Sequence, residues 1–216
     1  MSQFDNIETY EKLIGTDYKP PLERFSRVLL RLGVAADEVQ RAFDGFEWDM
    51  TDDLFDTGIV YAWGWEIADF KLEGSEITIS PFVMGYTPTI DAAVADNWFH
   101  CGFRIDTDQL IPQYIWGGHV PWHYPAEAQQ LITTLARAMH QEFEQATIYF
   151  TDISQETDLT DAVMKNDTGK RWRFNYALFP LEPLNLYMPI PASHAGRFSG
   201  GCFEAWNRNT WPQFTS

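Results

Sequence analysis

The feature of the sequence that most constrains the fold is a hairpin pattern between Phe70 and Ile79. Gly74-Ser75 separates two short runs, and glycine at the first central position is what a two-residue type II′ turn requires. In that register Leu72 faces Ile77 and Phe70 faces Ile79, so four apolar side chains share one face. The pattern therefore predicts two antiparallel strands, and the β-branched and aromatic residues of 58–67 predict another strand before them.

Apolar periodicity predicts several helices. Asp5 followed by Glu8 resembles a capping pair, which predicts a helix over 6–14. Stripes of apolar residues predict a second helix over 22–33 and a short third one over 37–43. A stripe running from Ala128 to Phe143 after Pro125, with Gln129 on the opposite face, predicts one long helix that packs on the sheet.

Further strands are predicted over 98–105, 147–150 and 171–176, and a short helix capped by Asp158 is predicted to end at Met164. Helices that precede and alternate with hairpin-linked strands favour an α+β fold with a mixed or mostly antiparallel sheet. We expect a single domain over 1–216. It would comprise a helical unit (1–45), an α+β core (46–180) and an irregular, aromatic-rich C-terminal segment (181–216).

Charge is the strongest global signal. The chain of 216 residues has 15 Lys and Arg against 31 Asp and Glu, a net charge of -16. Fourteen of the acids and only two of the bases lie between Asp44 and Asp108. Phosphate neutralisation dominates affinity for nucleic acid, so such a surface repels DNA, RNA and anionic membranes at long range. It attracts a basic protein partner.

The acidic residues also form a local pattern. Four of them fall at i, i+3, i+4 and i+7, which is one face if the segment is helical. The candidate partner-binding residues are these four and two acids of the hairpin: Asp49, Asp52, Asp53, Asp56, Glu73 and Glu76. The run lacks the alternating acids and central glycine of a calcium loop, so we expect a docking or solvated face and no metal.

Other motifs carry little chemistry. Cys101 and Cys202 lack metal or redox spacing and are expected to be buried free thiols. The D-x-D triplet 106–108 is explained as a turn that starts a helix. A basic cluster over 165–173 is explained as an internal counterweight to the acids. No cofactor motif is present, and without a leader or membrane span we expect a cytoplasmic protein.

The most enzyme-like segment is the loop 117–123. His119 and His123 are four residues apart, but Pro121 disfavours the helix that a zinc site would need. With a distant acid such as Asp152 the two histidines could still perform general acid–base chemistry.

Three functions remain open from the sequence. The leading one is an immunity-type inhibitor that binds and neutralises a basic partner such as a bacterial toxin. The alternatives are a phage-like nucleic-acid mimic that blocks a host DNA-binding enzyme, and a small hydrolase or transferase using His119, His123 and Asp152.

Overall fold

An antiparallel sheet of eight strands forms the centre of the computed structural model, which describes residues 3–47, 59–61, 65–86, 88, 94–111, 123–182 and 184–211. The strand order is β2-β3-β4-β1-β5-β6-β8-β7, and every neighbouring pair is antiparallel. The strands are β1 (Phe4–Lys12), β2 (Ile59–Tyr61), β3 (Ser80–Tyr86), β4 (Trp98–Asp106), β5 (Ile148–Asp152), β6 (Tyr176–Pro180), β7 (His194–Ser199) and β8 (Cys202–Asn207). The predicted α+β class is confirmed.

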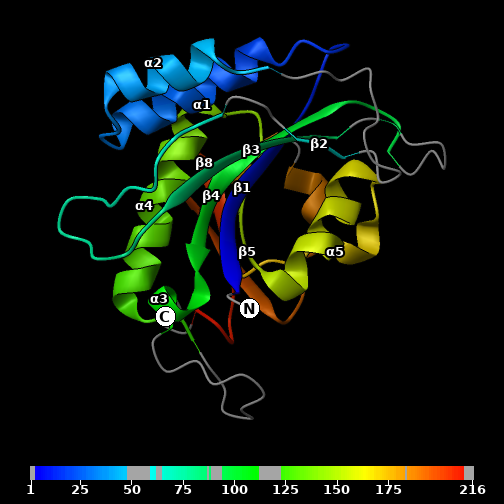
Figure 1. Cartoon of the computed structure of the whole chain (residues 1–216). Helices are drawn as coiled ribbons and strands as arrows, with labels where there is room; N and C mark the ends of the chain where they lie inside the picture. Colours follow the sequence, from blue (N-terminus) through cyan, green and yellow to red (C-terminus); the bar gives the residue numbers. More distant parts are fainter. Residues whose placement is uncertain are drawn as a thin grey trace.

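Helices cover both faces of the sheet (Figure 1). They are α1 (Lys19–Arg31), α2 (Ala36–Asp44), α3 (Thr107–Leu110), α4 (Ala126–Glu142) and α5 (Ile153–Met164), with short 3-10 turns η1 (Thr168–Lys170) and η2 (Leu184–Tyr187). In Figure 1, α1, α2 and α4 lie on one side of the sheet and α5 on the other. The predicted helices over 22–33 and 37–43 and the long helix after Pro125 are confirmed.

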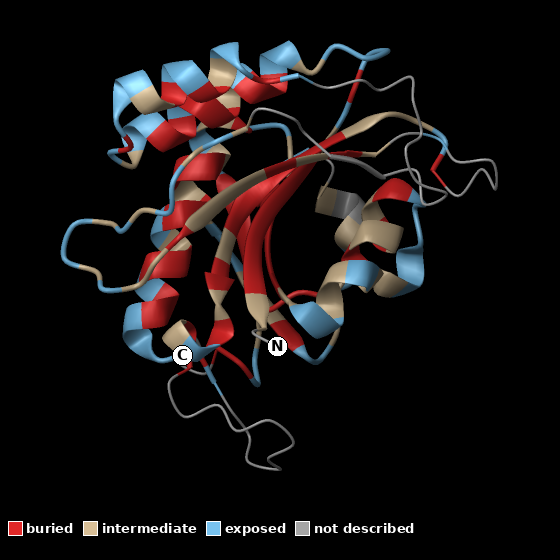
Figure 2. Cartoon of the chain, in the orientation of Figure 1, coloured by how far each residue is buried: buried red, intermediate tan, exposed pale blue. Residues whose placement is uncertain are grey.

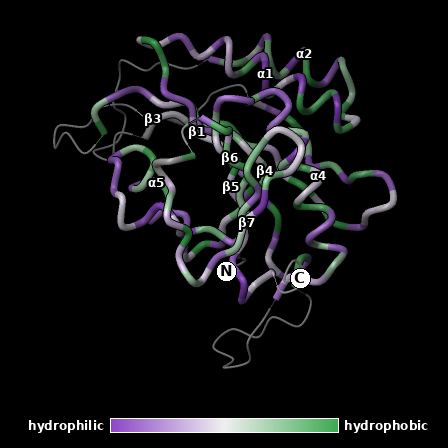
Figure 3. Tube along the Cα trace, turned by 180° about the vertical axis from the view of Figure 1, so that it is seen from behind, coloured by the Kyte–Doolittle hydropathy of each residue, from purple (hydrophilic) through white to green (hydrophobic). Residues whose placement is uncertain are grey.

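Two apolar cores follow from these layers. The larger lies under α1, α2 and α4 and includes Phe25, Phe103 and Ile132, whereas the smaller lies under α5 and includes Leu159 and Phe179. Figure 2 shows buried residues along the strands and on the inward faces of the helices. Seen from behind in Figure 3, hydrophobic and hydrophilic residues alternate along α1 and α2, as expected of helices with one face on the core.

The helix predicted over 6–14 is wrong, because this segment forms β1 in the middle of the sheet. It pairs with β4 on one side and β5 on the other. Both of its faces are covered, so the polar Asp5 and Glu8 are buried together with Ile7. A strand buried on both faces need not alternate apolar and polar residues. The spacing of Asp5 and Glu8 matches that of a capping pair only by coincidence.

Two predictions near α5 also need correction. Asp152 is the N-cap of this helix, with Gln155 completing a capping box, so α5 starts before the predicted cap at Asp158. The strand predicted over 171–176 is a turn that leads into β6. Its alternating pattern has another cause: Phe174 packs in the smaller core, while Arg173 reaches Asp158 of α5 at 3.5 Å.

The C-terminal segment, expected to be irregular, contains the hairpin of β7 and β8. Gly200 and Gly201 form its turn with φ values of 58° and 82°, the left-handed conformation that tight hairpin turns require. Trp211, beyond β8, is fully buried in the larger core. The glycine pair thus connects two strands, although the sequence made it look like a break in regular structure.

Of the hairpin predicted over 70–79, the pairing of Phe70 with Ile79 is confirmed, whereas the two predicted strands are not formed and the turn is shifted. The backbones of Phe70 and Ile79 form an isolated β-bridge through two hydrogen bonds of 3.0 and 2.8 Å. The turn lies one residue earlier than predicted, because Ser75 N bonds Leu72 O and Gly74 occupies the second central position with φ 78°.

Candidate functional site

Most of the predicted acidic face lies outside the described residues, namely Asp49, Asp52, Asp53 and Asp56. Glu73 and Glu76 are both exposed at the turn of the 70–79 hairpin. Glu76 pairs with Lys71 at 3.0 Å, and Glu73 has no ion-pair partner within the described part of the chain. An exposed pair of this kind holds its carboxylate weakly.

The described residues bring further acids together beside α2. The Glu38 carboxylate accepts a hydrogen bond of 2.7 Å from the backbone amide of Ala68. This contact places the start of α2, with the exposed Asp37, next to the segment that carries the exposed Glu66 and Asp69. The sequence could not reveal this neighbourhood, since the two segments are far apart in the chain.

Most of the basic side chains form ion pairs within the molecule. Eleven of the 15 Lys and Arg side chains lie within 4.0 Å of a carboxylate: Lys12, Arg24, Arg27, Arg31, Arg41, Lys71, Arg137, Lys165, Lys170, Arg173 and Arg197. The basic cluster at 165–173 neutralises Asp158 and Asp161 of α5, as the counterweight interpretation expected. Hydrogen bonds from Lys165 and Lys170 lower the pKa of Asp161. Most of the basic charge is therefore already paired with carboxylates of the same chain.

A buried cluster that the sequence did not reveal joins Asp5 to Asp152, which are opposite each other in the β1–β5 ladder. Thr107 Oγ1 and the Tyr124 hydroxyl donate to the Asp5 carboxyl at 3.3 and 3.4 Å. Asn175 Nδ2 donates to Asp152 Oδ2 at 3.0 Å. Burial and the charge of Asp152 raise the pKa of Asp5 to about 8, so at neutral pH Asp5 keeps a proton.

This pair of carboxyl groups is a recognisable acid–base arrangement, but its contacts are internal. Asp5 is only 1% exposed, and Asp152 holds the N-terminus of α5 through Ser154 N at 2.9 Å. His123 is exposed, and His119 lies outside the described residues. The described residues thus join Asp152 to Asp5 and not to a histidine.

Gln129 belongs to the same region and corrects another prediction. The sequence placed it on the polar face of the long helix, but it is buried and donates a hydrogen bond of 2.6 Å to the carbonyl oxygen of Tyr124. The bond satisfies the carbonyl group of Tyr124, which lies just before the N-cap Pro125 and outside the helix.

A second buried cluster lies between the sheet and α5. Glu8 and His100 are fully buried and 2.8 Å apart, and Thr151 Oγ1 donates to the other oxygen of Glu8 at 2.6 Å. The Tyr10 ring stacks on His100 with centroids 4.1 Å apart. Glu156 of α5 lies near this cluster. Burial raises the pKa of Glu156, and the charge of Glu8 raises it further. With its polar atoms bonded internally, the cluster orders the sheet beneath α5.

The described residues include two cysteines. Cys101 and Cys202 are buried free thiols, as predicted. Within the described residues, no group of three or more His, Cys, Asp or Glu side chains is placed to hold a metal ion.

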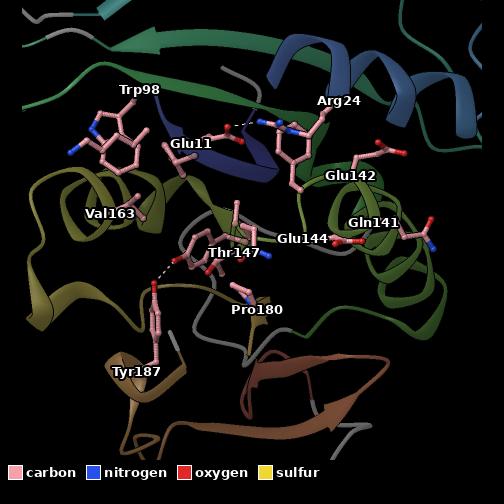
Figure 4. A pocket seen from close by; sticks show the side chains of 16 residues that line it. Glu11, Arg24, Trp98, Gln141, Glu142, Glu144, Thr147, Val163, Pro180 and Tyr187 are labelled. Carbon is pink, nitrogen blue, oxygen red and sulfur yellow. Dashed lines mark hydrogen bonds and ion pairs between the residues drawn. The ribbon is translucent and has the colours of Figure 1, made fainter. Parts of the chain in front are cut away.

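A cavity of about 640 Å³ opens beside the end of β1 (Figure 4). Aromatic side chains form much of its wall, including Trp98, and Tyr187 shares a hydrogen bond of 3.0 Å with Tyr149. Several of the charged side chains that line it form ion pairs with side chains of the same chain. Arg24 pairs with Glu11 at one side of the view, and other arginines pair with Glu142.

A second cavity of about 540 Å³ adjoins the first. The two share Gln141, Glu144, Gln145 and Pro180 in their linings. The second cavity extends from the end of α4 to the turn between β7 and β8, where Gly200 and Gly201 contribute backbone without side chains. Its charged lining differs from that of the first, since it contains no lysine or arginine.

Comparison with protein-family models, with curated proteins and with solved structures found no match for this chain. No helix within the described residues is both long and apolar enough to cross a membrane.

Proposed function

We propose that this chain is an acidic cytoplasmic interaction protein of the immunity type, which binds and neutralises a basic partner such as a bacterial toxin. The observation that carries the proposal is the uncompensated negative charge. The net charge is -16, and eleven of the 15 basic side chains already pair with carboxylates inside the molecule. Few cations remain on the surface to repel a basic partner.

The physical role of such a surface is steering. A strongly acidic protein accelerates its encounter with a basic cleft, and complementary charges suppress unsuitable partners. Exposed acids beside α2 (Asp37, Glu66, Asp69) and at the hairpin turn (Glu73) supply part of that field. The four aspartates at 49–56 are the proposed centre of the contact, and Glu73 and Glu76 extend it.

The test is affinity capture of the tagged chain from its own cells at about physiological salt, where the Debye length is about 8 Å. We expect one basic protein in stoichiometric amount. A variant with Asp49, Asp52, Asp53 and Asp56 changed to Lys should lose it. A matched control changes four exposed acids elsewhere to Lys, namely Asp17, Glu23, Asp108 and Glu127, and should retain it.

Three outcomes count against the proposal. Full capture by the variant at 49–56 would remove that face from the interface. Equal loss in both variants would reduce the effect to bulk charge. Recovery of several unrelated DNA-binding proteins would favour a nucleic-acid mimic instead.

A further inference from the structure

Strand β7 forms one edge of the sheet, since β8 is its only neighbour among the described strands. The ladder between β7 and β8 runs without interruption from His194 to Ser199, and this described stretch contains neither a bulge nor a proline. Bulges, prolines and lysines are the usual means by which proteins keep an edge strand from pairing with another chain. The β7 edge therefore has the regular shape that a further strand needs.

Backbone groups point outward from this edge. In an antiparallel ladder, every second residue directs both its N–H and its C=O toward the same neighbouring strand. The Arg208 amide donates to the Ser193 carbonyl oxygen at 2.9 Å, so the odd-numbered residues of β7 are those that bond β8. Gly196 and Phe198 accordingly direct their N–H and C=O groups away from β8. No hydrogen bond reaches these groups from the described part of the chain.

The edge is complementary to itself. A two-fold axis at Arg197 would place Gly196 opposite Phe198 of a second copy, so that the N–H and C=O groups of each residue meet those of the other. Phe198 is 70% exposed and packs on Phe203 with ring centroids 5.2 Å apart. The Phe203 ring also covers Gly196, where it lies 2.4 Å from the position of an added Cβ. The Phe198 ring of a second copy would thus lie beside a glycine and against Phe203, an aromatic pairing that stabilises glycines in edge strands.

The charge distribution allows two acidic chains to meet at this edge. From 183 to 216 the sequence has a single acid, Glu204, and two bases, Arg197 and Arg208. Glu204 is fully buried and accepts a hydrogen bond of 2.8 Å from Arg197, so each copy brings a carboxylate beside the arginine at the two-fold axis. The acid-rich segment 44–108 supplies β2, β3 and β4, at the opposite end of the strand order. Pairing at β7 therefore separates the acid-rich ends of the two chains, which keeps their repulsion low.

We propose that this chain forms a two-fold symmetric dimer in which β7 pairs antiparallel with β7 of a second copy. The sheet of each chain then continues into the sheet of the other. Because a strand of six residues buries little surface, the association is weak and depends on concentration. The inference does not depend on the proposed function. It adds to that function a dimer that presents two acid-rich ends.

The test is sedimentation equilibrium of the full chain at physiological salt. Concentrations from about 1 µM to about 1 mM cover the range of weak contacts, and the average mass should rise from that of one chain toward that of two. Phe198→Lys removes the ring and places a lysine on the edge, and it should weaken dimerisation by about tenfold or more. The matched control, Ile14→Lys, makes the same change at a residue that is 92% exposed and lies outside β7, and it should dimerise as the unmodified chain does.

Amide hydrogen exchange followed by NMR locates the contact. The outward amides of Gly196 and Phe198 should exchange rapidly in dilute protein and more slowly at high concentration. The Arg197 amide, which bonds β8, should be protected at both concentrations.

Four results overturn the inference: the mass of one chain at the highest concentration, full dimerisation of Phe198→Lys, equal weakening by both lysine variants, or association that leaves exchange at Gly196 and Phe198 unchanged. Dimerisation at β7 without capture of a basic partner would support the inference and count against the proposed function alone. Capture of a basic partner by a chain that remains a monomer would do the reverse.

Discussion

The Asp5 cluster makes a prediction that can be worked out in detail. Asp5 is buried opposite Asp152, and burial together with the charge of Asp152 raises its pKa from the usual 3.8 to about 8. Asp5→Asn replaces the protonated carboxyl with an amide of nearly the same shape. The hydroxyl groups of Thr107 and Tyr124 can rotate to donate to or accept from this amide.

The sign and size follow from proton linkage. Asp5 in the unfolded chain loses its proton near pH 4, whereas in the folded chain it keeps the proton until about pH 8. The free energy of unfolding should therefore fall as pH rises between these values and become level above them. At about 1.4 kcal/mol per pH unit, the upper bound of this loss is about 6 kcal/mol.

The assay is urea unfolding followed by tryptophan fluorescence at pH 5, 6, 7 and 8. We expect Asp5→Asn to gain stability relative to the unmodified chain as pH rises, by about 1 kcal/mol per pH unit. Groups not coupled to Asp5 titrate equally in both proteins and cancel in the difference. Asp108→Asn, at an exposed position, is the control and should show no such slope. A stability difference independent of pH would refute the shifted pKa of Asp5.

Further predictions concern the sheet and the thiols. Gly102→Ala should destabilise the protein by on the order of 3 kcal/mol, measured by urea unfolding, because the added carbon would lie 2.1 Å from the Ile7 carbonyl oxygen. Gly169→Ala, which meets only a flexible side chain at 3.3 Å, is its control. Glu8→Gln removes the carboxylate that faces His100 and should cost about 3 kcal/mol, visible as a lower thermal midpoint, and an unchanged midpoint would contradict the buried pair. Both cysteines are buried, so they should react with a thiol reagent only after denaturant is added, and rapid reaction of the native protein would contradict their burial.

The candidate site could be predicted only in part. The sequence identified the acids Glu73 and Glu76, and both are exposed at a turn. It could not identify the second cavity, because Glu144, after α4, and Glu182, after β6, line one cavity only once the helix has packed on the sheet. Nor could it reveal the cluster of Asp5 and Asp152, since the raised pKa depends on neighbours from distant segments.

The sequence by itself determined the elements with one buried face. The apolar stripes predicted α1 and α4, and the pairing of Phe70 with Ile79 followed from alternation around a glycine. The tertiary structure decided β1, because a central strand covered on both faces carries no periodic signal of its own. It also decided which charges are paired and which remain exposed. Periodicity reports a boundary between core and water, whereas pairing of strands and of charges depends on partners that only the folded chain brings together.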